Sequence, residues 1–500
     1  METSLHVWKW KAASVGSVLL LAALACVQAR GQSISGLSTG VSVGLNAGQG
    51  FDLAVNAYAG SVTTAHATTE AIPLSLDDAV QRGLAHNLAV VLAEQNERIA
   101  SGQQLQQLNN LLPNISAVVV RRRNQINLAA LGFRPGLLAQ FPPGIFPAGV
   151  TFGPIVTVNV VTAQANLQQP LFDLSAIEEF RAAKGNRIAA YYSTQSARGQ
   201  VIQNVATAYL QVLDDMANLD NARALLATDD LLQRQAGDAV QAGTATHLDF
   251  LRAQVQMQQQ EQAEIAAENA LAKAKIALNR QIGLAAEQPI QLTDVTPYAD
   301  LDTMTLAQAR QMAYANRQDY QGAQAQARAA NFQRKAARFE RVPTLSFGGN
   351  YGVTGTVGGI YHGTFIASGE LSVPIFREAS LRGDHDVAEA ERSRALNQLA
   401  DLRVHIDAQL RDSLLDVAAA KQLVEVAHSN VDLARQSLSD ATDRFTNGVE
   451  DNLAVVQAQA VLAAAQAQWV NSLYQFNQSK LGLARNLGIL QQQYRTYLGK

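Results

Sequence analysis

Cysteine is almost absent from this chain of 500 residues, and the single one, Cys26, lies near the N-terminus. The mature chain therefore has no disulfide, and either no thiol or one that carries a lipid. An excess of positive charge is also missing, since the net charge is −3, and we expect no nucleic acid as a partner. Aromatic residues make up only 6% of the chain, which suits long helices with polar surfaces better than a large globular core.

Long hydrophobic runs are lacking beyond residue 30, where no stretch reaches 18 consecutive apolar residues. A membrane-spanning helix needs about 20 such residues. Every backbone polar group inside a bilayer must be satisfied, which leaves a closed β-barrel as the other spanning structure. If this chain crosses a membrane, we expect it to do so as a barrel.

Catalytic and metal-binding patterns are missing too. No two of the eight histidines are four residues apart and none neighbours the cysteine, so no zinc pattern is present. The run Asp384-His385-Asp386 lies early in a predicted long helix, where consecutive side chains point to different faces, and we interpret it as a solvated cluster. The glycines of 348–359 are not followed by Gly-Lys-Ser/Thr and form no phosphate loop. We expect no enzymatic activity, no metal and no cofactor.

The N-terminus is typical of a secretory signal peptide over 1–29. Two lysines precede an apolar run of fourteen residues, 12–25, which is too short to anchor the chain in a bilayer. Cleavage after Val27-Gln28-Ala29 fits the small-residue rule. Alternatively, Ala23-Leu24-Ala25-Cys26 is a weak lipobox, which would make Cys26 a lipidated first residue. We favour simple cleavage.

Two parts of the chain resemble each other at constant offsets. The corresponding positions are Leu76 and Leu306, Pro113 and Pro343, Gly243 and Gly448, and Gln254 and Gln459. The offset is 230 for the first two pairs and 205 for the last two, which indicates one duplicated unit with a length difference in its middle. We expect a flexible extension over 30–73, a first repeat over 74–290, a linker over 291–303, a second repeat over 304–491 and a short tail over 492–500.

The helices expected in each repeat are too long for a globular domain. A first helix runs over 75–112, with its twin over 305–342, and each stops at a proline. A second runs from about 175 to 236, with its twin over 379–445. Some 60 residues at about 1.5 Å each span on the order of 90 Å.

The last helix predicts a coiled-coil seam. Ten positions alternate steps of three and four: Leu453, Val456, Ala460, Ala463, Ala467, Val470, Tyr474, Asn477, Leu481 and Ala484. Nine of the ten are apolar, and alanine dominates, so we expect a partner helix to approach this face closely.

Four short segments are expected to form strands, over about 114–125, 155–169, 344–356 and 361–373. In the last two, apolar and polar residues alternate over roughly the ten residues that a tilted strand needs to cross a bilayer. The first two repeat this pattern less cleanly, and 114–120 is mostly apolar. Apolar side chains on one face and Thr, Ser and Asn on the other are typical of a barrel with a wet lumen. The alternation slips at Val160-Val161, which we interpret as a β-bulge.

Between the first two strands, an apolar and irregular loop is expected over 121–154 at the strand tips. Arg121-Arg122-Arg123 lies at its base. These three side chains either contact lipid phosphates or are simply solvated, and we favour the second interpretation. Four strands cannot close a membrane barrel, since the smallest have about eight. Three protomers with four strands each are the simplest closure with a passable lumen.

At this point the chain resembles the TolC family of outer-membrane efflux proteins, from about 74 to 491. The resemblance rests on Leu74-Ser75-Leu76-Asp77-Asp78-Ala79, Leu112-Pro113-Asn114-Ile115-Ser116, Leu167-Gln168-Gln169-Pro170-Leu171-Phe172, and the segments 243–254 and 448–459. It implies an α+β membrane protein that is a homotrimer: a 12-stranded outer-membrane β-barrel, in contact with lipid, continued by a periplasmic α-helical coiled-coil barrel. It also implies two partners, a periplasmic adaptor protein and an inner-membrane transporter.

The resemblance further places the periplasmic entrance at the two helix-hairpin turns, 241–249 and 446–453. Gly243, Leu248, Gly448 and Leu453 then belong to the turns on which an adaptor docks. The candidates for lining or gating the pore are Asp249, Arg252, Glu450, Asp451 and Gln457.

This sequence departs from the family pattern at the entrance. The two aspartate columns that narrow the pore read Ala454 and Gln457, and the arginine column that pairs with Asp249 reads Glu450. The family's Arg–Asp latch therefore cannot form in its usual way. Glu450 and Asp451 either form a negative mouth that attracts cations or cap the start of a helix, and the two roles are compatible.

Two functions from different classes remain. The first is a passive exit duct in the outer membrane, which carries substrates delivered by a pump and its adaptor. The second is a periplasmic coiled-coil adaptor or scaffold without a membrane barrel. The four strand-length segments favour the duct, because an adaptor has no need of them.

Overall fold

The structure is a computed structural model in which the chain divides into two units, 1–53 and 54–500. The described residues all belong to the second unit. They are 57–62, 66–127, 130, 155–294, 300–301, 304–447, 449 and 452–497. The expected signal peptide, Cys26 and most of the 121–154 loop lie outside them.

The elements follow one another along the second unit in a regular succession. In chain order they are η1 (Ala57–Ala59), β1 (Ile72–Leu74), α2 (Leu76–His86), α3 (Leu88–Asn109), β2 (Asn114–Asn127), β3 (Ile155–Phe172), α4 (Leu174–Gln241), α5 (His247–Gln281), β4 (Ile290–Leu292), α6 (Leu306–Asn316), α7 (Gln318–Phe339), β5 (Thr344–Thr356), β6 (Tyr361–Ser372), α8 (Glu378–Thr446), α9 (Asn452–Asn486) and α10 (Leu490–Tyr497). The succession of two short helices, two strands, a long helix and a 35-residue helix occurs twice.

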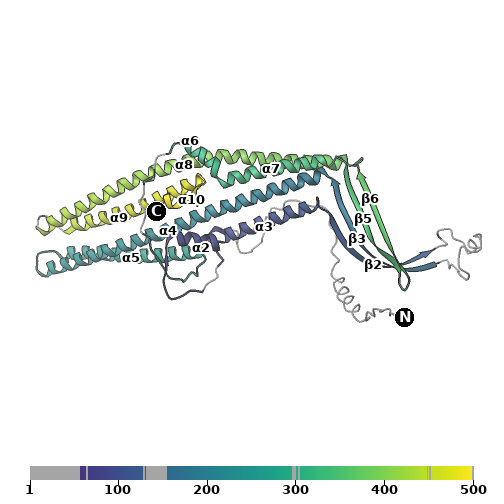
Figure 1. Ribbon diagram of the computed structural model, residues 1–500. Helices are drawn as coiled ribbons and strands as arrows, with labels where there is room; N and C mark the ends of the chain where they lie inside the picture. The colour runs from purple at the N-terminus through teal and green to yellow at the C-terminus, as the bar shows by residue number, and fades with distance from the viewer. Residues whose placement is uncertain are drawn as a thin grey trace, which may run out of the picture. The chain divides into compact units, whose positions relative to one another are not determined.

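The strands and the helices share one lateral order. The antiparallel sheet has the order β2-β3-β5-β6, and the helices joined to those strands neighbour one another as α3-α4-α7-α8. Further from the sheet, α5 and α9 take the places of α3 and α7, so that the order becomes α5-α4-α9-α8. The sheet lies at one end of this unit and the two helix-hairpin turns lie at the other (Figure 1). Each strand is therefore joined directly to the helix that continues its place in the lateral order, and no connection between the described strands and helices crosses another.

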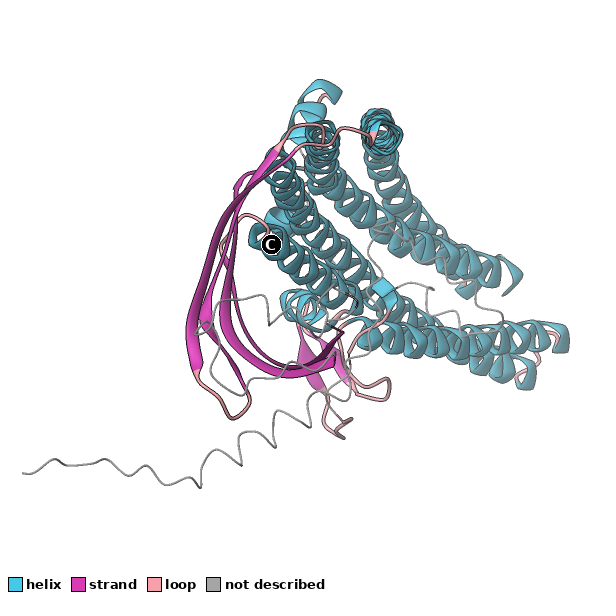
Figure 2. Ribbon diagram, turned by 90° about the vertical axis from the view of Figure 1, so that its right-hand side faces the viewer, coloured by secondary structure: helices cyan, strands magenta, loops and turns pink. Residues whose placement is uncertain are grey.

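The sheet is curved (Figure 2), and its register divides the side chains between two different faces. Residues directly opposite each other in neighbouring strands share a face. One row joins Ala117, Ala165, Tyr351 and Phe365, and the adjacent row of the other face joins Ser116, Asn166, Asn350 and Ile366. The first face carries most of the large exposed apolar side chains, among them Tyr351 at 74% and Phe365 at 76%. The second face is mostly Asn, Gln, Ser and Thr.

The expected bulge at Val160-Val161 is wrong. Pairing between β2 and β3 continues without interruption through both residues, which lie opposite Arg122 and Arg121. The register shifts instead between Pro170 and Phe172, and β3 continues past Pro170 to Phe172. Along β3, the polar side chains instead change from one face of the sheet to the other near Val160. This change occurs at the level where β5 ends, because Val160 is the first residue of β3 that pairs with β5.

The first helix of each half is broken, where the sequence analysis expected one continuous helix. Asn87 ends α2 and caps α3 by accepting a hydrogen bond from the Ala89 amide at 3.0 Å. Arg317 occupies the matching break between α6 and α7. A left-handed glycine packs against each break: a Cβ on Gly283 would lie 2.5 Å from the His86 side chain, and one on Gly488 2.6 Å from the Arg317 amide nitrogen. Only glycine combines a positive φ with such a close approach.

The expected seam of α9 is buried toward its C-terminal end, at Asn477, Leu481 and Ala484, but the buried face is offset from it nearer the hairpin turn. Ala460 and Ala467 of that seam are exposed. The residues packed against α8 are Val455, Ala458, Leu462, Ala465, Trp469 and Phe476. Over Leu453–Asn486, α9 is also long and apolar enough to span a bilayer by length and composition, which for a lone helix is weak evidence of a span.

The main core lies midway along the helices. It joins α2, the middle of α4 and the ends of α5 and α9 to the small parallel sheet of β1 and β4. Tyr209 ties these parts together, because its hydroxyl donates to the Leu74 carbonyl at 3.0 Å and to Asp294 at 2.9 Å. Part of the expected extension contributes to this region, since η1 and β1 lie before residue 74 or end there. Part of the expected C-terminal tail does so as well, in α10.

Candidate functional site

The first helix-hairpin turn joins α4 to α5 and is built on a glycine and a capping box. Gly243 has φ +74° and nothing within 4 Å of a Cβ built on it, so the turn needs its backbone freedom rather than its small size. Thr246 accepts a hydrogen bond from the Asp249 amide, and the Asp249 carboxylate accepts in return from the Thr246 amide at 3.0 Å. This reciprocal cap fixes the direction in which α5 starts.

Asp249 and Arg252, two of the predicted gating residues, are brought together by this helix start. Their side chains form an ion pair at 3.5 Å, and that of Asp249 is 16% exposed. Hydrogen bonds from Thr246, assisted by the Arg252 charge, hold the pKa of Asp249 below its usual value. The carboxylate therefore stays ionised at the turn. Leu248, beside it, is 54% exposed and accessible to another protein.

The second turn joins α8 to α9, and three of its predicted residues, Gly448, Glu450 and Asp451, lie outside the described residues. Leu453 is half-buried at the start of α9, and Gln457 is exposed one turn further on. Gln457 lines a groove of about 560 Å³ between α8 and α9, together with Asp440 and Arg444. The groove is polar on its α8 side, which supplies both charged groups.

The two turns lie at the same end of the structure, and the hairpins contact each other through α4 and α9 (Figure 1). Near the turns, Leu232 of α4 packs against the cluster of Ala441, Val455 and Ala458. One turn earlier on α4, Asp229 is only 2% exposed. Among the described residues, Leu232 is the α4 side chain that packs against this apolar cluster.

Buried carboxylates on α4 are features that the sequence analysis missed. Burial raises the pKa of Asp214 to about 6, with the neighbouring Asp215 adding to the shift. Burial also raises the pKa of Asp229, despite a long hydrogen bond of 3.5 Å from Gln256. Asp214 and Asp229 lie on the same side of α4 as Leu225, because steps of three and four residues lead from one position to the next. The sequence does not show that neighbouring helices cover this side.

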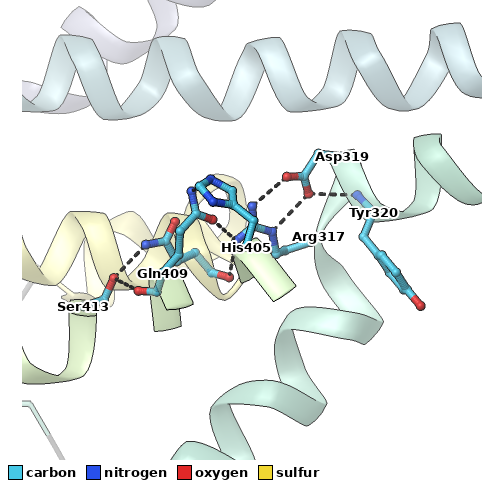
Figure 3. A network of polar contacts seen from close by, with 7 residues as sticks. Arg317, Asp319, Tyr320, His405, Gln409 and Ser413 are labelled. Carbon is cyan, nitrogen blue, oxygen red and sulfur yellow. Dashed lines mark hydrogen bonds and ion pairs between the residues drawn. The ribbon is translucent and has the colours of Figure 1, made fainter. Parts of the chain in front are cut away.

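A polar network at the α6–α7 break was missed as well (Figure 3). Arg317 is 4% exposed and donates to Asp319 at 2.6 Å and to Gln409 of α8 at 2.8 Å. Gln409 shares a hydrogen bond of 2.9 Å with His405, and its carbonyl accepts from Ser413 at 2.7 Å. Although burial opposes ionisation, the bonds from Arg317 hold the pKa of Asp319 below its usual value. The network fastens α7 to α8 and is a structural joint rather than a reactive site.

The candidate site is therefore the end of the structure at which the two helix-hairpin turns lie (Figure 1). Within the described residues, no group of three or more His, Cys, Asp or Glu side chains is placed to hold a metal ion.

Comparisons with known proteins agree with this arrangement. The family model described as outer membrane efflux protein matches residues 79–284 and 309–489. The toluene efflux pump outer membrane protein TtgF of Pseudomonas putida is 28% identical over 328 residues, which cover 62% of this chain and 65% of TtgF. The solvent efflux pump outer membrane protein SrpC of Pseudomonas putida is 25% identical over 331 residues, which cover 63% and 69%. The match with TtgF thus spans just under two thirds of its length.

Solved structures show the same fold at low sequence identity. A membrane protein from Pseudomonas aeruginosa superposes with a TM-score of 0.71 at 19% identity, covering 83% of this chain and 93% of that one. The CmeC outer membrane channel of Campylobacter jejuni gives 0.69 at 16% identity, covering 83% and 86%. The predicted resemblance to the TolC family is confirmed by these findings. Because the family model matches more than half of its residues, the chain belongs to the outer membrane efflux protein family.

Proposed function

We propose that this protein is the outer-membrane channel of a tripartite efflux system, a homotrimer that serves as a passive exit duct. The duct is a 12-stranded barrel with four strands from each protomer, continued by a periplasmic barrel of helices. The relatives named as outer membrane proteins of efflux pumps support this function over that of a soluble adaptor. The sequence has no nucleotide-binding motif, so the energy for export must come from other proteins. The partners in this proposal are a periplasmic adaptor and an inner-membrane transporter.

The observation that carries the proposal is a pair of open edges shared by the sheet and the helices. Among the described residues of one chain, β2 and β6 each have a single neighbouring strand, and α5 and α8 are the outermost helices further from the sheet. Unpaired backbone groups are not tolerated in lipid, so β2 must pair with β6 of another copy. The rotation that relates two copies paired in this way also places α8 of one copy beside α5 of the next.

Both outer helices expose apolar side chains along the surface that such closure would cover. On α5 these are Leu248, Leu251, Val255, Ile265 and Ile276, and on α8 they are Val404, Leu415, Val426 and Leu433. Each of the nine is at least 43% exposed in the single chain. Apolar stripes at helical spacing on the surface are typical of helices that pack against a partner.

The sheet faces support insertion into a bilayer. The face that carries Tyr351 and Phe365 also carries Leu345 and Leu371, all four exposed. Side chains of this kind on the outside of a barrel meet lipid, while the Asn, Ser and Thr face lines a wet lumen. Such a lumen is permissive, so the choice of substrate falls to the pump. We further propose that 74–290 and 304–491 arose by duplication, because they repeat the same succession of elements.

Opening of the entrance requires the two hairpins to separate. We infer that the turns at 241–249 and 446–453 move apart when an adaptor docks on Gly243, Leu248, Gly448 and Leu453. Glu450 and Asp451 then line the mouth with Asp249, whose charge is kept by its cap. Three copies of each acid around one axis attract cations and repel anions.

A crosslinking experiment tests the duct and its opening together. The double variant Leu232→Cys/Val455→Cys joins α4 to α9 across the two hairpins, where these side chains pack in one cluster. Its matched control, Ala441→Cys/Ala458→Cys, joins α8 to α9 within one hairpin of the same cluster. We expect both proteins in the outer-membrane fraction as heat-modifiable oligomers, with export blocked only in the first and restored by a reductant. A soluble periplasmic product would contradict the duct, and unchanged export with the first crosslink formed would contradict the opening.

A further inference from the structure

Three consecutive arginines lie on the edge strand β2, close to the end that is distant from the helices. Arg121 and Arg123 point to the same face as Ile115 and Val119, which are 71% and 76% exposed. Arg122 points to the opposite face. All three residues are exposed. Two of the three cations thus belong to the face that our proposal turns toward lipid.

This face changes its chemistry abruptly at Arg121. On β2 the residues below it are apolar, whereas Arg121, Arg123 and Gln125 follow above. The neighbouring strand changes at the same level, because Val161 lies opposite Arg121 and Asn159 lies opposite Arg123. The row through Arg121 and Val161 continues to Gly355 and ends at Tyr361, the first residue of β6. Tyrosine is enriched where barrels meet the lipid headgroups, so the row marks the boundary between hydrocarbon and water.

Carboxylates are scarce around these arginines. The 75 residues of 98–172 contain neither Asp nor Glu. The single acid in the four strands is Glu370, which lies opposite Ser346 on the other face and at the other end of the sheet. Among the described residues, none forms an ion pair with Arg121, Arg122 or Arg123. Two cations about 7 Å apart, as alternate residues of one strand, therefore face outward at a membrane boundary.

We propose that Arg121 and Arg123 form a binding site for the phosphate groups of a phosphorylated glycolipid in the outer leaflet. The inference depends on the proposed barrel, which turns this face toward lipid and this end of the strands outward. One guanidinium group can donate two parallel hydrogen bonds to two oxygens of a phosphate. A second arginine two residues away therefore suits a headgroup with more than one phosphate. The apolar side chains of Val119 and Val161 directly below would receive acyl chains, which free phosphate lacks.

The test uses the full-length oligomer, purified in detergent and titrated with diphosphoryl lipid A while bound lipid is counted by native mass spectrometry. The double variant Arg121→Gln/Arg123→Gln removes the two outward cations. We expect its Kd for this lipid to rise by roughly tenfold or more, because hydrogen bonds to charged groups are each worth about that factor. Arg122→Gln is the matched control, since it removes a cation from the same strand but from the lumen face. We expect its Kd to stay within about twofold of the unaltered protein.

Further arms separate the lipid from other sources of phosphate. Dephosphorylated lipid A should bind equally weakly to all three proteins, and inorganic phosphate should not displace the bound lipid. Equal affinity of the double variant and the unaltered protein, an equal loss in Arg122→Gln, or displacement by inorganic phosphate would each overturn the inference. Normal oligomers and export in the double variant leave the duct intact whatever the lipid result. An unaltered protein that forms no membrane-inserted oligomer would overturn the duct, and this inference with it.

Discussion

The hairpin of α4 and α5 and the hairpin of α8 and α9 have the same architecture, but different interactions hold them together. Their second helices are both 35 residues long, and their first helices have 68 and 69. In the first hairpin, the helices are joined by Arg223, which donates to Glu264 at 3.0 Å and to Glu268 at 2.6 Å. Gln260 adds a bond to the Ala222 carbonyl at 3.2 Å. Beyond the main core, which α5 joins through Leu278, the first hairpin is thus fastened largely through polar groups.

The second hairpin is fastened by apolar side chains. Three clusters follow one another between α8 and α9, and α9 contributes Phe476, Trp469, Leu462 and Val455 to them. No Asp or Glu is present in the sequence of α9, whereas that of α5 has four. Exposed ion pairs contribute about 0–1 kcal/mol each and weaken in salt, while burial contributes about 25 cal/mol per Å² and does not. We therefore expect salt to weaken the polar contacts of the first hairpin more than the apolar contacts of the second.

The largest effect expected from this comparison is the loss of an apolar contact in the second hairpin. Leu462→Ala should lower the free energy of unfolding by about 2–5 kcal/mol, because it leaves a cavity in a buried cluster. Met257→Ala, at the corresponding position of α5, should cost about 1 kcal/mol or less, because Met257 is half-buried and outside the clusters. Denaturant titration of the helical circular dichroism signal measures both. Equal losses would break the distinction between the hairpins.

A smaller effect is expected from pH, and it should come from the first hairpin. The pKa of Asp214 is raised to about 6 by burial, above its ordinary 3.8, so the folded state binds a proton more tightly than the unfolded state does. Stability should therefore rise as pH falls from 7.5 through 6. Among the described residues of α8, no carboxylate is buried.

The variant Asp214→Asn should gain on the order of 1–3 kcal/mol at pH 7.5 and lose most of this pH dependence. Asp220→Asn is the control, because that carboxylate is exposed on the same helix. Melting temperatures measured between pH 5 and 8 decide the matter. A slope that persists in Asp214→Asn would assign the effect to another group.

The smallest effect is expected at the ion pairs of the first hairpin. Arg223→Gln should lower the melting temperature slightly at low ionic strength, and the difference should vanish in 1 M NaCl, where the Debye length is about 3 Å. Arg435→Gln removes an arginine of α8 that pairs within its own helix, with Asp432. It should show a smaller difference still. A deficit of Arg223→Gln that persists in 1 M NaCl would mean that the side chain acts through packing.

The strands were predictable because their signal is local. The alternation and the flanking prolines placed β5 over 344–356 and β6 over 361–373, and the structure has Thr344–Thr356 and Tyr361–Ser372. The slip at Val160 was misread, because a bulge and an exchange of faces look alike in one strand. Only the pairing with β2 and β5 distinguishes them. The two helix breaks also differ in whether the sequence reveals them. Asn87 is a good capping residue, whereas Arg317 makes no capping bond and is held in place by α8 and α9.

The face of α9 and the buried acids could not be predicted from the chain alone. Ala and Gln occupy all sides of α9, so a seam of regular spacing exists in more than one phase. The phase is decided by where Phe476, Trp469 and Leu462 find partners on α8. At the entrance, Thr246-x-x-Asp249 is a readable capping box. The burial of Asp229 is not readable, because it depends on neighbouring helices.

The length of α4 and α8 has a mechanical consequence. Neither helix contains a proline, and each continues unbroken from the end of a strand to a hairpin turn. A rod of 68 residues is about 100 Å long and cannot absorb torsion at a joint that it does not have. We therefore expect a twist applied at the turn to reach the sheet through α4 and α8, because neither helix has a break at which it could be absorbed.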